Sequence, residues 1–143
     1  MIIEDKNKMP QISQALQELE NYDVQIGVFD DEEMILIASV HEYGSLNVPE
    51  RSFIRSALDE NHQRIDREKE RLLGDVLDLR ISAYRYYERL GQLMVNIIQE
   101  RMDQVRTPPL QPETRENRTG SNPLVDTGEL QSSIEYRVVR SHA

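Results

Sequence analysis

The sequence predicts an α+β fold, in which a small, mostly antiparallel sheet packs against two long helices. Two short segments, 23–29 and 134–140, alternate apolar and other residues in the manner of half-buried strands. Two longer stretches, 53–76 and 79–105, repeat apolar residues at helical spacing.

A short helix and a strand open the chain. Apolar side chains at helical spacing predict a helix over residues 11–21, after Pro10. In the strand that follows, Val24, Ile26 and Val28 share one face, so we expect that face to be buried.

Residues 34–40 are apolar apart from Ser39, and this pattern alone fits a buried strand or a helix. Acidic residues precede the run and Gly44 follows it, which suits the two ends of a helix. We therefore predict a helix from Glu33 to Tyr43.

The first long helix is predicted to begin after a cap at Ser52 and to continue to Val76. Gly74 weakens helices by about 1 kcal/mol relative to alanine, so a break or bend is expected there. The charged middle of this helix is predicted to face solvent, supported by the pairs Arg64–Glu68, Asp66–Lys69 and Glu68–Arg71.

The second long helix is predicted over residues 79–105. Its stripe of Tyr, Met and Ile residues suggests either core packing or a ligand pocket, and core packing is the better interpretation. Gly91 lies in this stripe, where a small residue would allow another backbone to approach closely.

Residues 107–125 hold four prolines and one glycine, which is unusual for a connection inside a compact domain. We expect a single domain over residues 1–143, with 107–125 as an extended loop or arm. Asp126 and Glu129 then have the spacing of a helix capping box.

Composition narrows the function classes. The chain has no cysteine, so it has neither disulfides nor thiol chemistry. No apolar run reaches the ~20 residues that span a bilayer, and no signal peptide is apparent, so we expect no membrane contact. Residues 1–60 hold 13 acidic and 4 basic side chains, which accounts for the whole net charge of −9. A DNA-gripping module would need a basic stripe, and none is present.

Catalytic, cofactor and metal sites are not predicted. His41-Glu42 resembles part of a zinc-protease motif, but the second histidine is missing because position 45 is Ser. The spacing of Asp126 and Glu129 is explained by helix capping alone. We therefore expect no enzyme and no cofactor.

Two segments together resemble the tail-completion, or head–tail joining, proteins of tailed bacteriophages. The first is Val40-His41-Glu42-Tyr43-Gly44-Ser45 followed by Val48-Pro49-Glu50-Arg51-Ser52-Phe53-Ile54-Arg55. The second is Pro108-Pro109-Leu110, then Pro123-Leu124-Val125-Asp126-Thr127-Gly128 with Leu130. The chain departs from the family's pattern just before Gly120: members often carry Arg-Lys there, whereas this chain has Asn117-Arg118-Thr119.

The resemblance implies a structural subunit of the phage neck that joins the tail to the DNA-filled head. It implies a homo-oligomeric ring, six-fold, which contacts neighbouring connector and tail proteins and lets double-stranded DNA pass without specific binding. Such a subunit resides in the virion and, during assembly, in the host cytoplasm. The residues expected at its interfaces are Tyr43, Pro49, Arg51, Phe53, Arg55, Pro108, Pro109, Leu110, Arg118, Leu124, Asp126, Thr127 and Gly128.

Two alternatives stay open. One is a small cytosolic adaptor that binds a basic partner through residues 30–33. The other is a metal-dependent hydrolase that uses His41, Glu42 and Asp126.

Overall fold

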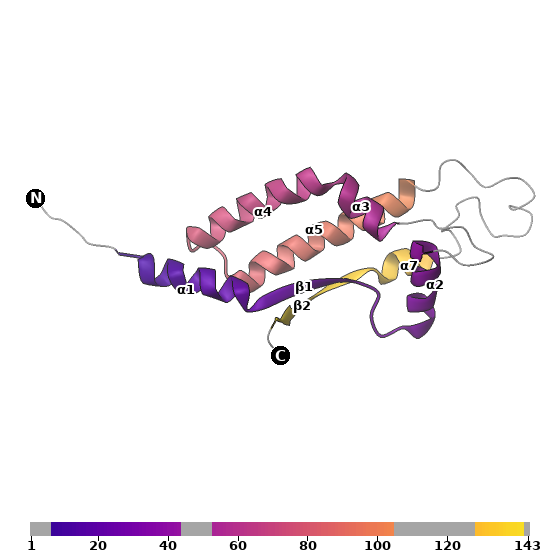
Figure 1. Ribbon diagram of the computed structural model, residues 1–143, viewed down its shortest axis with the longest axis horizontal. Coiled ribbons are helices and arrows are strands. Elements are labelled where there is room, and N and C mark those ends of the chain that lie inside the picture. Colours follow the sequence, from indigo (N-terminus) through magenta and orange to yellow (C-terminus); the bar gives the residue numbers. More distant parts are fainter. Residues whose placement is uncertain (1–6, 44–52, 105–127, 142–143) are drawn as a thin grey trace, which may run out of the picture.

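The computed structural model describes residues 7–43, 53–104 and 128–141, which form an elongated α+β body (Figure 1). The predicted fold class is confirmed: a two-stranded antiparallel sheet packs against long helices. In chain order the elements are α1 (Met9–Glu20), β1 (Tyr22–Gly27), α2 (Glu32–Tyr43), α3 (Ile54–Glu60), α4 (His62–Leu77), α5 (Ala83–Gln104), α7 (Gly128–Ser133) and β2 (Glu135–Arg140).

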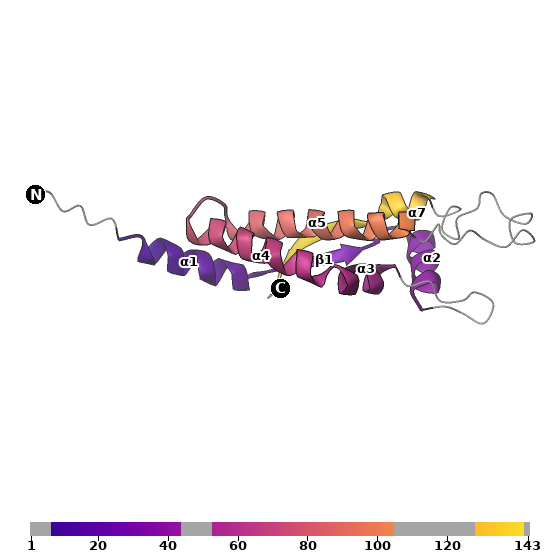
Figure 2. The ribbon, with the colours of Figure 1, turned by 90° about the horizontal axis from the view of Figure 1, so that it is seen from above.

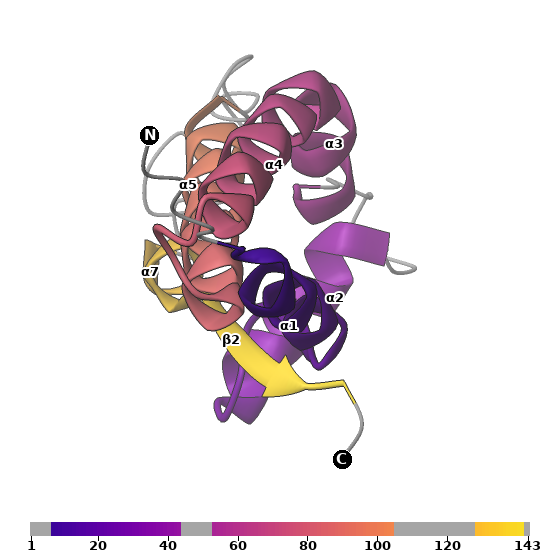
Figure 3. The ribbon, with the colours of Figure 1, turned by 90° about the vertical axis from the view of Figure 1, so that its left-hand side faces the viewer.

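Helix α5 is the centre of this body. Helices α3 and α4 lie along one side of it and the sheet lies along another (Figures 1 and 3). Its core-facing side chains include Leu90, Ile97, Ile98 and Met102, all of which are buried. Most of the stripe that the sequence places on this helix is therefore core, as predicted, although Tyr84 near its start is exposed. Helix α1 extends beyond the sheet at the end of the molecule that is opposite to α2 (Figure 2).

The two strands pair antiparallel, with Tyr22 opposite Arg140 and Gly27 opposite Glu135. Paired residues share a face, so Val24 and Ile26 lie on the same side as Tyr136, and this side packs against α5. The other side faces away from the helices. The half-buried strand predicted from the alternation is thereby confirmed.

The first long helix is divided at a different position from the one predicted. It breaks at Asn61, between α3 and α4, where the Asn61 Nδ2 donates to the Ala57 carbonyl oxygen at 2.8 Å. Asparagine competes with helical backbone bonds in this way. Gly74 instead lies within α4 and does not break it.

Helix α4 ends at Leu77, and the predicted start of the next helix at Leu79 is wrong. Leu79 adopts a left-handed φ of 59°. The N–H groups of Leu79 and Arg80 donate to the carbonyl oxygens of Val76 and Asp75, at 3.0 and 2.8 Å. This is a Schellman closure with leucine in the position that usually holds glycine. Helix α5 begins at Ala83 instead.

Gly91 admits a side chain from the sheet and not another backbone. A Cβ atom on Gly91 would lie 2.7 Å from Cγ of Tyr136 on β2. The absent side chain is therefore what lets β2 lie directly on α5.

Surface ion pairs follow the prediction only in part. Arg71 pairs with Glu68, as the spacing predicts, and also with Asp75. Arg64 reaches across to Glu100 on α5, at 3.1 Å, because the two helices lie side by side. Within this fully described helix, Asp66 and Lys69 form no ion pair.

Candidate interaction site at the junction of α2 and α3

The carboxylate of Glu42 joins the end of α2 to the start of α3. One carboxylate oxygen, Oε2, accepts from the N–H groups of Phe53 and Ile54, at 3.1 and 3.0 Å. The other, Oε1, accepts from the N–H of Arg55 at 3.0 Å and from its Nε at 2.8 Å. Helix α3 is thus capped by a side chain from the preceding helix. The residue in the capping position of α3 is Phe53, whose own side chain makes no capping hydrogen bond. Ser52, the predicted cap, lies outside the described residues.

The residue that supplies this carboxylate is buried, since only 4% of the surface of Glu42 is exposed. Burial alone raises the pKa of Glu42, because it disfavours the charged form. The hydrogen bonds from the backbone N–H groups and from Arg55 outweigh burial, so the pKa of Glu42 lies below its usual value. Glu42 is therefore held ionised, next to the positive end of the α3 dipole.

Arg55 completes the junction from the surface. Its Nη2 donates to the main-chain oxygen of Glu42 at 2.7 Å, which satisfies one of the carbonyls at the end of α2. Its guanidinium also lies 5.1 Å from the ring centre of Tyr43. Arg55 was expected to be available to acidic partners, but in the single chain it is engaged with the acidic Glu42.

Phe53 lies beneath the junction and is fully buried. It shares a core cluster with Ala38 of α2 and Leu130 of α7. The expectation that Phe53 is displayed to a partner is not met in the single chain: it positions α3 from inside. Because Leu130 follows Gly128 at the start of α7, the described parts of the two sequence motifs meet at one end of the molecule (Figure 1).

Helix α7 is fastened to the end of α5 by a reciprocal amide pair. Gln99 donates from Nε2 to the carbonyl oxygen of Gln131 at 3.0 Å, and Gln131 donates back to that of Gln99 at 3.2 Å. Gly128 begins α7, and its carbonyl oxygen accepts from the hydroxyl of Ser132 at 3.0 Å. The end of the molecule that holds α2, α3 and α7 is therefore a set of helices fixed to one another.

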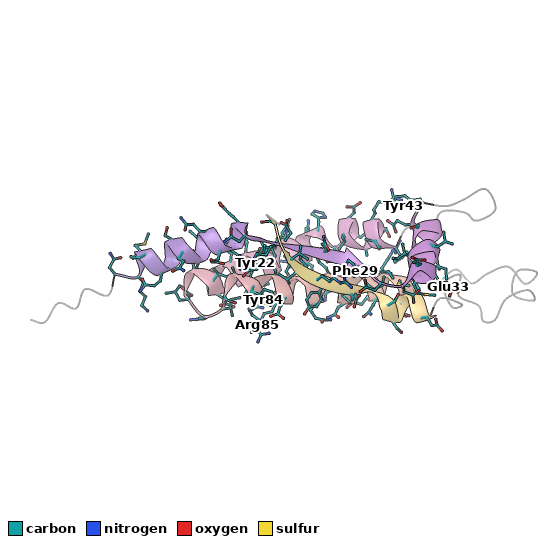
Figure 4. All side chains as sticks on the ribbon, turned by 90° about the horizontal axis from the view of Figure 1, so that it is seen from below. Tyr22, Phe29, Glu33, Tyr43, Tyr84 and Arg85 are labelled. Atoms are coloured by element: carbon teal, nitrogen blue, oxygen red, sulfur yellow. The ribbon has the colours of Figure 1, made fainter. Side chains whose placement is uncertain are left out.

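Residues 34–40 of α2 are apolar apart from Ser39, yet only part of this stretch is covered. Met34 and Ala38 face the core, whereas Leu36 is 65% exposed, Tyr43 is 70% exposed and Ile35 is also exposed. We call Ile35, Leu36 and Tyr43 the α2 surface. Tyr43 lies at the outer end of α2 (Figure 4). Large apolar side chains that are exposed together often mark a protein interface, so the α2 surface is suited to a protein partner.

A small pocket adjoins the α2 surface. It has a volume of about 210 Å³ and is lined by Val28, Ile35, Ala38, Ser39, Glu42, Tyr43 and Ile54. Pockets for small-molecule ligands usually measure some 300–1,000 Å³. This one is the size for a single side chain, which favours a protein partner over a free ligand.

Two of the four acidic residues at 30–33 are engaged within the chain. Asp31 caps α2, since its Oδ1 accepts from the N–H of Met34 at 3.1 Å. Asp30 forms an ion pair with Arg137 of β2, whose guanidinium also lies over the ring of Phe29. The predicted acidic start of this helix is confirmed. Two of the four carboxylates with which the adaptor alternative would bind a basic partner are therefore already engaged within the chain.

The remaining predicted interface residues cannot be placed. Nine of them lie outside the described ranges, namely Pro49, Arg51, Pro108, Pro109, Leu110, Arg118, Leu124, Asp126 and Thr127. The placed ones are Tyr43, Phe53, Arg55 and Gly128, and all four are at the same end of the molecule.

Sequence reasoning missed the capping role of Glu42. It considered the residue only beside His41, as a metal or acid–base pair. The signal is present but non-local: a glutamate in the last turn of one helix and three N–H donors 11–13 residues further on. In this geometry the chain itself occupies both carboxylate oxygens of Glu42, so the oxygens are not free to bind a metal or a substrate proton.

The described residues contain no cluster of three or more His, Cys, Asp or Glu side chains that could hold a metal ion. Among the same residues, no helix combines the length and apolar character of a membrane span.

The chain was also compared with known proteins. No protein-family model, curated protein or solved structure matches it.

Proposed function

We propose that this protein is a non-enzymatic structural subunit of a bacteriophage neck, which assembles into a ring and joins the tail to the DNA-filled head. The two sequence motifs support this proposal by their resemblance to tail-completion proteins. Their described parts, in α2, α3 and α7, lie together, as expected of residues that serve one interface.

The observation that carries the proposal is the exposed α2 surface. Leu36 and Tyr43 are among the most exposed large apolar side chains of the described chain, although they belong to a helix fixed at both ends. Asp31 caps its start and the Glu42 junction holds its end. A rigid, apolar surface next to a pocket for one side chain has the properties of a permanent protein interface.

The charge of the sheet agrees with passage of DNA without binding. The side of the sheet that faces away from α5 carries Asp23, Glu135 and Arg137, and Arg137 is already paired with Asp30. Tight binding to DNA requires several unneutralised basic groups, each of which displaces a counterion from a phosphate. This face of the sheet has no basic side chain in excess of its acidic ones.

The test is complementation of a phage whose copy of this gene is inactivated. Loss of the protein is expected to leave filled heads and free tails that electron microscopy shows as separate particles. Wild-type protein supplied from a plasmid should restore joined virions, and mass spectrometry should detect it in them. Joined, infectious particles that lack the protein would refute the proposal.

A matched pair of variants tests the α2 surface. Leu36→Asp places a charge on the exposed surface of α2 and is expected to fold, because Leu36 is 65% exposed. It should nevertheless fail to restore joining. Asn96→Asp adds the same charge at an exposed position of α5 and should restore joining fully. Equal complementation by the two variants would show that the α2 surface is not an interface.

A further inference from the structure

We infer that copies of this protein join head to tail through their sheets, with the outer edge of β2 in one copy pairing with the outer edge of β1 in the next. This inference rests on the proposed ring and names the surface that closes it. The partner is therefore a second copy of this chain, and the contact is a backbone ladder.

The register determines which backbone groups point away from the sheet. The N–H of Ser141 donates to the carbonyl oxygen of Asn21 at 2.9 Å, and these residues continue the register of the sheet by one pair. In an antiparallel ladder, hydrogen-bonded pairs alternate with pairs that are not hydrogen-bonded to each other. Counting from Asn21, the inward-bonded residues of β1 are Asp23, Gln25 and Gly27.

The intervening residues present their N–H and C=O groups at the outer edges. On β1 these are Tyr22, Val24 and Ile26, and on β2 they are Tyr136, Val138 and Arg140. Within the described part of the chain, no hydrogen bond reaches these outward groups. Each strand therefore has an edge ready to template another strand, which proteins normally cover, twist or charge.

Charge distinguishes the two edges. β1 carries one charged side chain, Asp23, whereas β2 carries Glu135, Arg137 and Arg140, of which Arg137 is already paired with Asp30 and Glu135. Pairing β1 with another β1 would bring two Asp23 side chains onto one short ladder that holds no basic residue, and like charges across a ladder are destabilising. Pairing β1 with β2 brings Asp23 to the strand that holds the arginines. Charge complementarity thus favours contact between unlike edges.

Contact between unlike edges is what a ring requires. It is a heterologous interface, in which each copy uses one patch toward one neighbour and a different patch toward the other. Rotation about an axis that runs roughly along the strands preserves strand direction, so β1 of the next copy is antiparallel to β2 of the first. The antiparallel order within one copy is thereby continued between copies. Helix α5 packs against both strands, and among the described residues no backbone hydrogen bond joins it to either of them.

The absence of cysteine from the chain makes a clean cross-linking test possible. Gln25 and Val139 lie on the face away from α5 and are bonded inward, so across copies they would form the close, non-hydrogen-bonded type of pair. Asp23→Cys and Gln25→Cys chains carry one affinity tag, and Arg137→Cys and Val139→Cys chains carry another. Each single-cysteine chain is oxidised alone and in every β1–β2 mixture, both as purified protein and on assembled particles. Asn96→Cys, at an exposed position of α5, serves as the control that measures disulfide formation by random collision.

Mixed disulfide dimers between a β1 variant and a β2 variant should form in at least one combination, several-fold above the level of Asn96→Cys. Single variants oxidised alone should give no more dimer than that control. Dimers of β2 variants alone would overturn the inference in favour of a two-fold pairing. The absence of mixed dimers in both materials would also overturn it. If virions still contain the protein in that case, the neck function stands and only the sheet contact fails.

Discussion

Replacement of Glu42 by glutamine tests the junction between α2 and α3. Glutamine has nearly the same shape but offers one acceptor oxygen and one NH₂ group where glutamate offers two acceptor oxygens. Whichever way the amide turns, two N–H donors face an NH₂ group. These are either the pair from Phe53 and Ile54 or the pair from Arg55.

The magnitude follows from those two donors. A buried donor left without a partner costs about 1–3 kcal/mol. The Phe53 N–H is buried and the others are partly buried, so water can compensate in part. We expect Glu42→Gln to reduce the free energy of unfolding by about 3 kcal/mol. For a chain of this length, that corresponds to a melting temperature lower by roughly 10 °C.

Urea denaturation followed by circular dichroism measures this loss. Glu68→Gln is the control, because Glu68 pairs with Arg71 on the exposed surface of α4. Removal of an exposed pair should cost no more than about 1 kcal/mol. If Glu42→Gln costs no more than Glu68→Gln, the Glu42 carboxylate does not stabilise the junction as argued.

The same variant predicts the sign of a pH dependence. The folded pKa of Glu42 is lowered, so ionised Glu42 contributes stability that is present above its ordinary pKa and is lost as pH falls through the lowered folded pKa. The difference in stability between wild type and Glu42→Gln should therefore shrink as the solution is acidified below the usual glutamate pKa. A difference that stays constant or grows on acidification would contradict the assigned pKa direction.

Two glycines provide opposite predictions for one substitution, checked by urea denaturation. Gly91→Ala forces Tyr136 aside, which should lower the free energy of unfolding by about 1–3 kcal/mol. Alanine's higher helix propensity offsets about 1 kcal/mol of this loss. The Cβ that Gly74→Ala adds meets no atom, so this variant should raise the free energy of unfolding by about 0.5–1 kcal/mol. Equal effects of the two variants on stability would disprove the close contact between Gly91 and Tyr136. Ser82→Ala removes the hydroxyl that accepts from the Arg85 N–H and should cost about 1 kcal/mol, whereas no loss would show that this cap is dispensable.

Local patterns were sufficient to predict most of the elements. The alternation around Val24 and Ile26 predicted β1 to within two residues at its C-terminal end, and the acidic residues before the apolar run predicted the start of α2 to within one residue. Both patterns report on neighbours close in sequence: side chains alternate along a strand, and acidic residues stabilise the first turn of a helix. The same holds for the assignment of the α5 stripe to the core.

Contacts between distant segments decided the rest. The helix break is an exception, because its cause is local. The break fell at Asn61 and not at Gly74, since the Asn61 side chain binds the Ala57 carbonyl oxygen four residues earlier, whereas a Cβ at Gly74 would meet no atom. Gly91 was correctly singled out as a point of close approach, but the approaching group was Tyr136, 45 positions later (136 − 91). Periodicity carries no information about which segment arrives at such a position.

The candidate site shows the same division. The sequence by itself determined that residues 34–40 form an apolar helix and that two motifs frame the helical part of the chain. Only the tertiary structure decided that α2 is left partly uncovered, that Phe53 is buried, and that Glu42 caps α3 from a separate helix. The physical reason is that exposure and capping across a junction depend on where whole helices pack, whereas helix formation depends on spacing along a few turns.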